Sequence, residues 1–214
     1  MTDHVKRRRR YDATRRQAQA QENRRAVISA AHRLFLDGGF AATTMTAIAG
    51  AAGVSVQTVY KVFGTKAGVA KAVFDVAIAG DDEPLTMLER PSLAKVRDEP
   101  DPRQKFRLYG EFLAEVSPRH VPVQIVIRDA AASDPDALAV WADLQTERLT
   151  GNAMFAEHLQ QLGALRRGIS TSEARDVIWA YNSPEVFQLL VLDRGWPPER
   201  YGAWIADALT AALL

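Results

Sequence analysis

The stretch AAGVSVQTVYKVFGTK, residues 51–66, decides the fold of this chain. Gly53 follows an apolar helical pattern over 45–52, at the place where a helix end needs a residue free to take a positive φ. Ser55 comes two residues later and can cap a second helix over 56–63. The pattern therefore predicts two short helices joined by a tight turn, which is a helix-turn-helix.

The second helix of this motif has an apolar face and a polar face. Val59, Val62 and Phe63 follow the i, i+3, i+4 spacing, so we expect them to share the buried side. Gly64 ends the helix, and Thr65 is expected to cap a fourth helix. The residues left to face outward are Gln57, Thr58, Tyr60 and Lys61.

An apolar helical pattern also precedes the motif, over residues 22–37. Gly38 and Gly39 follow this pattern, which predicts the end of a first helix. Thr44 then stands as the N-cap candidate of the helix-turn-helix, 45–64. The sequence thus predicts a small core of three helices, continued by a fourth, in a chain that is helical throughout.

Charge divides the chain into two unlike parts, although the net charge is only +1. Residues 1–75 contain 13 Lys and Arg against 5 Asp and Glu, whereas residues 76–214 contain 14 against 21. A basic segment suits a polyanion, because bound Lys and Arg release the counterions condensed on phosphates. We therefore expect nucleic acid to bind the first part of the chain and to avoid the acidic remainder.

Composition excludes several other classes of protein. An apolar content of 47% and a charged content of 25% are ordinary for a folded domain, and there is no apolar run long enough to cross a membrane. The chain has no cysteine, its four histidines lack metal-ligand spacing, and the common catalytic motifs are missing. We expect a cytoplasmic protein with no membrane partner, no catalytic residues, no metal and no cofactor.

The first 21 residues are basic and have no apolar periodicity. Five consecutive basic residues, Lys6 to Arg10, are followed by Arg15 and Arg16. We expect a basic disordered arm over 1–21. Such an arm is either a solvated tail or a supplement to DNA binding along phosphates or in a minor groove.

A DNA major groove accepts an α-helix, so the outward residues of the helix-turn-helix are candidate DNA contacts. Gln57 can reach base edges, and Val56 and Thr58 can offer methyl groups to thymine. Candidates for phosphate binding are Tyr60, Lys61 and Lys66. The alternative is a helical hairpin with a polar surface and no nucleic acid.

The run TTMTAIAGAAGVSVQTVYKVFGTKAGV, within residues 22–80, resembles the N-terminal helix-turn-helix domain of TetR-family transcriptional regulators. The matching residues, in order, are Gly39-Phe40, Thr43-Thr44, Ile48-Ala49, Ala52-Gly53-Val54-Ser55, Thr58-Val59-Tyr60, Phe63 and Lys66. The resemblance implies a homodimer that binds DNA through residues 22–80. It also implies a helical domain over 81–214 for dimerisation and effector binding.

The family pattern can be carried over to single positions. The DNA contacts that the resemblance implies are at Thr44, from Ser55 to Thr58, and at Tyr60 and Lys66. Two positions depart from the pattern: Ala47 replaces an acidic residue of a capping box, and Val62 replaces an aromatic residue or histidine. Gly68 is a third departure, and within the fourth helix it costs about 1 kcal/mol relative to alanine.

The remainder of the chain is predicted to form helices separated by polar, proline-containing turns. The expected helices cover residues 102–116, 121–132, 135–163, 171–194 and 198–213. Pro118 is expected to separate the first two, and Asp134 and Ser170 to cap the next two. Pro184 either kinks its helix or begins a fresh segment capped by Ser183.

The last helical segments carry more apolar surface than a terminal hairpin can bury, which indicates a homodimer. The candidate interface residues are Leu189, Leu190, Trp204, Ile205 and Leu209. The alternative is a larger core within one chain. A two-fold dimer reads two half-sites, so we expect a palindromic operator of double-stranded DNA.

Aromatic and polar residues in the C-terminal part suit a small-molecule effector. The candidates to line its pocket are Tyr109, Phe112, Arg128, Trp141, Trp179 and Tyr181, and for each of them the favoured alternative is plain packing in the core. The favoured function is a dimeric repressor that an unidentified effector releases from its operator. The alternative is a sequence-tolerant architectural DNA-binding protein that relies on the arginine-rich arm.

Overall fold

Two compact units make up the chain in the computed structural model, Met1–Val73 and Phe74–Leu214. The structure describes residues 3–83 and 87–214, with side chains described from Arg15 onward except that of Leu88. These residues form helices and connecting turns and include no strand. The predicted all-α fold is thereby confirmed. The two units divide within one helix, whereas the sequence predicts a boundary after residue 80.

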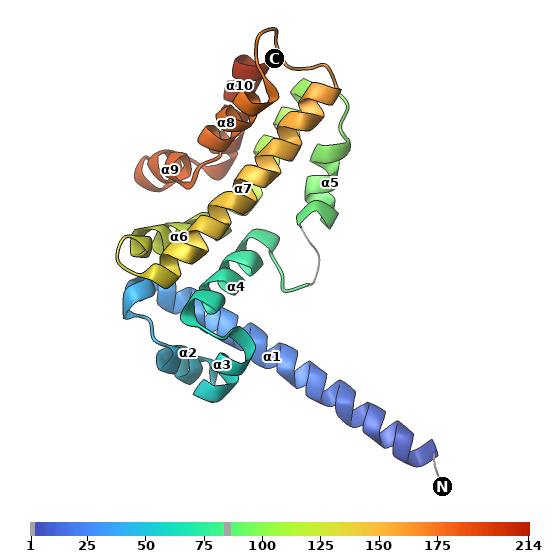
Figure 1. Cartoon of the computed structure of the whole chain (residues 1–214), viewed down its shortest axis with the longest axis vertical. Helices are drawn as coiled ribbons and strands as arrows, with labels where there is room; N and C mark the ends of the chain where they lie inside the picture. Colours follow the sequence, from blue (N-terminus) through green and yellow to red (C-terminus); the bar gives the residue numbers. More distant parts are fainter. Residues whose placement is uncertain (1–2, 84–86) are drawn as a thin grey trace. The chain divides into compact units, whose positions relative to one another are not determined.

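The N-terminal unit is built from α1 (Asp3–Ala42), α2 (Met45–Ala52), α3 (Val56–Phe63) and the first part of α4 (Lys66–Ala79). In this unit α2 packs against α1 and α3 packs against α2 (Figure 1). The buried apolar side chains of its core include Val27, Ala31, Phe35, Phe40, Ile48, Val59 and Val69. Phe35 and Phe40 stack with their ring centroids 5.6 Å apart and hold the chain where it leaves α1.

Four predicted helix boundaries of this unit are confirmed. Gly39 interrupts the end of α1 with a φ of 77°, and Gly53 follows α2 with a φ of 69°. The Thr44 hydroxyl accepts a hydrogen bond from the Ala47 amide at 3.1 Å. The Ser55 hydroxyl likewise accepts one from the Thr58 amide at 3.1 Å. The turn between α2 and α3 therefore follows from local chemistry that the sequence displays.

The basic arm differs from its prediction. The sequence predicts disorder over 1–21, whereas α1 is helical from Asp3 onward; Met1 and Thr2 lie outside the described residues. No glycine or proline interrupts residues 3–37, and Arg, Gln and Ala are good helix formers, so the helix extends toward the N-terminus. The side chains of residues 15–22, the part of this extension whose side chains are described, are exposed to solvent.

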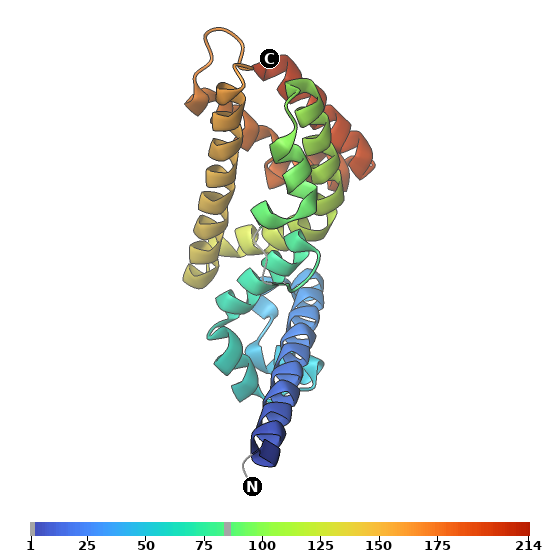
Figure 2. The ribbon, with the colours of Figure 1, turned by 90° about the vertical axis from the view of Figure 1, so that its right-hand side faces the viewer.

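The C-terminal unit holds the remaining elements (Figures 1 and 2). These are η1 (Met87–Glu89), α5 (Pro91–Asp98), α6 (Pro102–Ala131), α7 (Pro135–Gln161), α8 (Thr171–Tyr181), α9 (Pro184–Phe187), η2 (Gln188–Asp193) and α10 (Pro198–Leu213). Within the unit, α6 packs against α7 and α10, and α7 also packs against α8. The helix α6 is thus central to this unit, because it contributes to the contacts on both sides.

One helix replaces the two that the sequence predicts over 102–132. Pro118 was expected to separate them, and that prediction was wrong, because Pro118 and Pro122 both lie inside α6. A proline within a helix costs about 3 kcal/mol. Val116, Val121 and Ile127 are almost fully buried here, and burying a side chain of this size contributes roughly 1.5–3 kcal/mol. Packing therefore offsets the local preference.

The later helix starts agree with the sequence. Asp134 accepts hydrogen bonds from the amides of Asp136 and Ala137, which caps α7. Ser170 caps α8 by accepting from the Glu173 amide at 3.1 Å. Ser183 caps a fresh segment, α9, whose first residue is Pro184. Of the two alternatives at that proline, the fresh segment is the one observed.

A close crossing of α6 and α10 organises the C-terminal core. Gly110 on α6 and Gly202 on α10 are both buried, and a Cβ added to either one would overlap the carbonyl oxygen of the other. The two backbones approach this closely only because neither residue has a side chain. Around the crossing, α10 contributes Tyr201, Ile205 and Leu209 to the core.

Membrane insertion has no support among the helices of residues 3–83 and 87–214. None of them combines the length and the apolar character that a membrane span requires.

Candidate functional site

The helix α3 presents most of its predicted polar residues to solvent. Gln57, Tyr60 and Lys61 are exposed, with 52% of the Tyr60 surface accessible. Val56 and Thr58 are half-buried, so less of each side chain is accessible. The Thr58 hydroxyl also lies 2.8 Å from that of Ser55, within the cap of the helix. The outward surface of α3 therefore centres on Gln57, Tyr60 and Lys61.

The opposite face of α3 anchors the helix to the N-terminal core. Val59 is fully buried, and Phe63 is half-buried with the Arg24 guanidinium 5.2 Å from its ring centroid. Val62 was expected on this face, but 41% of its surface is exposed, and that prediction was wrong. With 3.6 residues per turn, Val62 lies about 60° around the helix from Val59, on the side away from Phe63.

Thr44 lies at the exposed start of α2, where its hydroxyl caps the helix. Ser55 occupies the equivalent place before α3 and is also exposed. Two helix N-termini are thereby open to solvent. Their first amides carry partial positive charge, which favours an anion such as a phosphate.

Lys66 is held by its own unit more tightly than the sequence predicts. Its ammonium donates a hydrogen bond to the Phe40 carbonyl at 2.9 Å and lies 4.1 Å from the centroid of the Phe40 ring. The side chain is half-buried, in contrast to that of Lys61. Lys66 therefore links α4 to the end of α1, and a phosphate would have to use one of its remaining N–H groups.

The structure explains why a glycine stands at position 68, inside α4, which the sequence alone does not. A Cβ at this position would overlap the carbonyl oxygen of Phe63, the last residue of α3. The loss of helix propensity at Gly68 thus permits the close passage of α4 past the end of α3.

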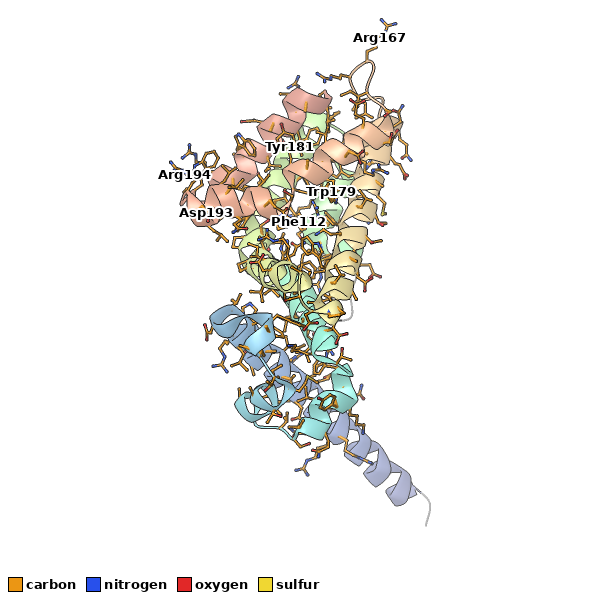
Figure 3. The ribbon with its side chains drawn as sticks, turned by 60° about the vertical axis from the view of Figure 1, so that its left-hand side comes forward. Phe112, Arg167, Trp179, Tyr181, Asp193 and Arg194 are labelled. Atoms are coloured by element: carbon orange, nitrogen blue, oxygen red, sulfur yellow. The ribbon has the colours of Figure 1, made fainter. Side chains whose placement is uncertain are left out.

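The six residues expected to line an effector pocket have different contacts. Tyr109 and Phe112 stack on α6 at 6.3 Å between ring centroids, and Trp179 on α8 joins them through the polar network described below. Figure 3 shows Phe112 and Trp179 in the part of the unit where α6, α7 and α8 lie. Tyr181 instead packs against Trp204, at 5.7 Å between centroids.

Arg128 makes its contacts with other residues than Tyr109 and Trp179. It forms ion pairs with Asp129 and Glu185 and donates a hydrogen bond to Gln188. These contacts account for Arg128 as a link between α6 and the start of α9. Trp141 is half-buried on α7.

A partly buried polar network links three helices, and sequence reasoning missed its central members. Asn182 donates to the Tyr109 hydroxyl at 2.6 Å and to the Asn152 carbonyl oxygen at 2.8 Å. Arg148 donates to the Asn182 side chain at 2.8 Å and to Gln145 at 2.8 Å. Gln145, Arg148 and Asn152 recur on one face of α7, and this polar stripe was the available signal.

Burial changes the acid–base properties of this network. It lowers the pKa of Arg148 to about 10, mainly because the charged form loses solvation, and the group still carries its charge at neutral pH. Burial raises the pKa of the Tyr109 hydroxyl, so that group remains neutral. In the described parts of the chain, no cluster of His, Cys, Asp and Glu has an arrangement that could hold a metal.

The five residues expected at a dimer interface divide into two sets. Ile205 and Leu209 are fully buried in the core of the single chain, so they have no accessible surface to offer a partner, and their assignment to the interface was wrong. They follow the core face of α10 instead. Leu189 and Trp204 are exposed, and Leu190 is half-buried.

These features define a class of protein: an N-terminal helix-turn-helix with an exposed second helix, joined to a helical domain. Residues 27–73 match the family described as bacterial regulatory proteins, tetR family. The resemblance in the sequence is thereby confirmed, and the N-terminal unit is a tetR-family helix-turn-helix domain. A family of regulatory proteins agrees with the expectation of a regulator rather than an enzyme.

Solved structures show the same fold over most of the chain. The transcriptional regulator FadR from Bacillus subtilis, in complex with stearoyl-CoA, is 16% identical with a TM-score of 0.69, and the match covers 88% of this chain and 98% of that one. The TetR-family regulator PfmR from Thermus thermophilus is 19% identical with a TM-score of 0.61, and the match covers 88% of this chain and 98% of that one. A Saccharomonospora viridis protein in complex with choline is 17% identical with a TM-score of 0.64, and the match covers 90% of this chain and 98% of that one. No curated protein matches the sequence.

Proposed function

We propose that this protein is a sequence-specific DNA-binding transcriptional regulator that places α3 in a major groove. The observation that carries this proposal is the division of α3 into a buried anchor at Val59 and an exposed face with Gln57, Tyr60 and Lys61. An α-helix held in this way fits the width of the major groove.

Each exposed group has a chemical role in this proposal. The Gln57 amide can pair with the edge of adenine, and Val56 can contact a thymine methyl group. Tyr60 and Lys61 bind phosphates and set the register of the helix. Thr44 and Ser55 bring two helix N-termini to the DNA backbone.

The finer proposal is a dimeric repressor that a small molecule releases from a palindromic operator. The exposed apolar residues near the C-terminus support a second copy of the chain as partner. FadR from Bacillus subtilis, which has the same fold, was solved with stearoyl-CoA, and this supports a small-molecule effector here. Such an effector acts by favouring a dimer geometry whose two α3 helices no longer match successive half-sites.

Operator selection tests this proposal. Purified full-length protein should enrich a palindromic sequence from random DNA. Lys61→Ala should weaken binding to every sequence and reduce the salt dependence by about one phosphate contact. Gln57→Ala should relax the preference at one or two base pairs. The matched control is Lys95→Ala, which removes the same charge from α5, in the C-terminal unit, and should leave DNA binding unchanged.

Operator selection also distinguishes a sequence-specific regulator from the alternative, a sequence-tolerant architectural DNA-binding protein. If the protein enriches no motif, the sequence-specific proposal is wrong. Deletion of residues 1–20 then decides whether the basic extension of α1 carries DNA binding alone. For a sequence-specific regulator this deletion lowers affinity and salt dependence but preserves the selected motif.

A further inference from the structure

Arg148 on α7 carries a partly buried positive charge that forms no ion pair with a carboxylate of the described residues; Glu185 acts on it only at longer range. Its Nη1 atom donates to the main-chain carbonyl of Trp179 and to Asn182, and its Nη2 atom donates to Gln145. All three partners are neutral oxygens, and no ion pair of Arg148 exists within residues 15–83 and 87–214. A charge that loses part of its solvation without gaining an ion pair raises the free energy of the folded protein, so a negative group from outside the chain would stabilise it.

Three hydrogen-bond donors around this charge are also unused. The Nε of Arg148, the Nε2 of Gln145 and the Nε1 of Trp179 are buried, and none has an acceptor in the described part of the chain. They belong to one cluster, because Gln145 bonds the guanidinium directly and the Trp179 ring centroid lies 4.3 Å from it. Each unused buried donor costs roughly 1–3 kcal/mol. The cluster thus lacks an acceptor and a negative charge together.

Aromatic rings lie on one side of the same cluster, directly or through Asn182. Tyr109 reaches it through the Asn182 amide, and Tyr109 in turn contacts Phe155, at 4.9 Å between centroids, and Phe112. Trp179 contributes the face of its indole ring. A ligand at this place would meet apolar rings on one part of its surface and cationic or neutral donors on another.

We propose that Arg148, Gln145 and Trp179 bind the carboxylate of a small molecule whose apolar body lies against these rings, and that this molecule is the effector. The inference rests on the proposed function and names the ligand class. A carboxylate supplies one negative charge and up to four acceptor positions, which matches one guanidinium with unused donors beside it. A phosphate would bring a second negative charge, and no second cation belongs to the described cluster.

The test uses full-length protein with phenylacetate, indole-3-acetate and decanoate, each beside its neutral amide, in calorimetry and thermal unfolding. At least one carboxylate should bind and raise the unfolding temperature, whereas its amide should bind at least about tenfold more weakly. Arg148→Gln should abolish this preference. Trp179→Phe keeps a ring but removes one donor, and should weaken carboxylate binding about tenfold and amide binding less, because a hydrogen bond to a charged acceptor is stronger than one to a neutral acceptor.

A matched control comes from Arg107→Gln, an exposed arginine on α6 that should leave carboxylate binding unchanged. Trp179→Phe keeps the test decisive if Arg148→Gln fails to fold. If none of the three carboxylates binds, or if each binds no better than its amide, the inference is wrong.

The same samples separate this inference from the proposed function. Operator binding is measured without ligand and then with the carboxylate that binds. The wild-type protein should release the operator when this carboxylate is added. The Trp179→Phe variant should stay bound to the operator at the same ligand concentration. Operator binding that no carboxylate affects overturns the effector role and leaves the DNA-binding function intact. Absence of operator binding overturns the proposed function itself.

Discussion

His120 on α6 shows how burial changes the chemistry of one residue. Its Nδ1 atom lies 2.9 Å from the Val116 carbonyl, and its ring packs edge-on against Phe74 at 5.5 Å between centroids. Loss of solvation lowers its pKa to about 4, and the charges of Arg119 and Arg148 act in the same direction, while the hydrogen bond to Val116 opposes them. The folded protein therefore holds this histidine neutral.

We predict that the stability of the C-terminal unit falls in mildly acidic solution because of His120. The folded pKa lies below the unfolded value of about 6.5, so the unfolded chain binds more protons and stability is lost as pH falls from about 6.5 toward 4. At pH 5 the loss amounts to about 2 kcal/mol relative to pH 7. Urea unfolding at both pH values measures this loss.

His120→Gln is the comparison for this measurement, because it keeps a polar side chain but does not titrate. The variant should lose less stability than the wild type between pH 7 and 5. An imidazole that titrates at 6.5 or above in NMR spectra of the folded protein would contradict the prediction.

Lys105 is a second residue whose role only the structure reveals. It is buried on α6, and its ammonium donates to the carbonyls of Val96 and Arg97 at the end of α5. Its cation thereby satisfies two carbonyls that the end of a helix leaves unpaired. In the sequence this lysine is indistinguishable from a surface residue, because nothing local marks the neighbouring helix end.

At the scale of elements, helix ends were predictable and helix partners were not. The caps at Thr44, Ser55, Ser170 and Ser183 depend on residues within three positions, so the sequence displays them. The continuity of α6 through Pro118 depends instead on burial against other helices.

The crossing of α6 and α10 leads to a prediction at this scale. Gly202→Ala adds a methyl group where the Gly110 backbone lies, so the two helices must separate. We expect a loss of about 2 kcal/mol or more in the free energy of unfolding, measured by chemical denaturation. The matched control is Gly151→Ala on the exposed face of α7, where an added Cβ meets nothing within 4 Å.

Gly151→Ala should stabilise the protein by up to about 1 kcal/mol, because alanine has the higher helix propensity. Equal destabilisation by the two substitutions would show that the α6–α10 contact is looser than the structure has it. We expect Gly202→Ala to lower the free energy of unfolding and Gly151→Ala to raise it.

At the scale of the whole molecule, exposed apolar residues indicate the proposed dimer. Leu189 and Leu192 in η2 are 59% and 49% exposed, and Trp204 on α10 is 36% exposed beside Trp196 and Tyr181. Large apolar groups that cluster on a surface favour a partner, because burying them removes apolar area from water.

We predict that the protein in solution has a mass near twice the 23.6 kDa of one chain. Leu189→Glu should shift it toward the monomer, because a carboxylate replaces an apolar contact. Light scattering coupled to gel filtration measures the mass. Leu138→Glu on α7, at a leucine with 53% exposure, is the matched control and should remain dimeric. A monomeric wild type, or an equal effect of both substitutions, would contradict the prediction.

The sequence by itself determined the all-α class, the helix-turn-helix and most helix starts. These depend on residues close along the chain: Gly53 ends α2, Ser55 begins α3, and Val59 marks its buried face. The tertiary structure alone decided which faces are covered. It buried Ile205 and Leu209, exposed Val62, and brought Arg148 on α7 to Trp179 and Asn182, which lie more than 30 residues later at the end of α8. Burial and pairing of this kind depend on neighbours far along the chain, and helical periodicity gives the spacing of residues on a face but not what that face meets.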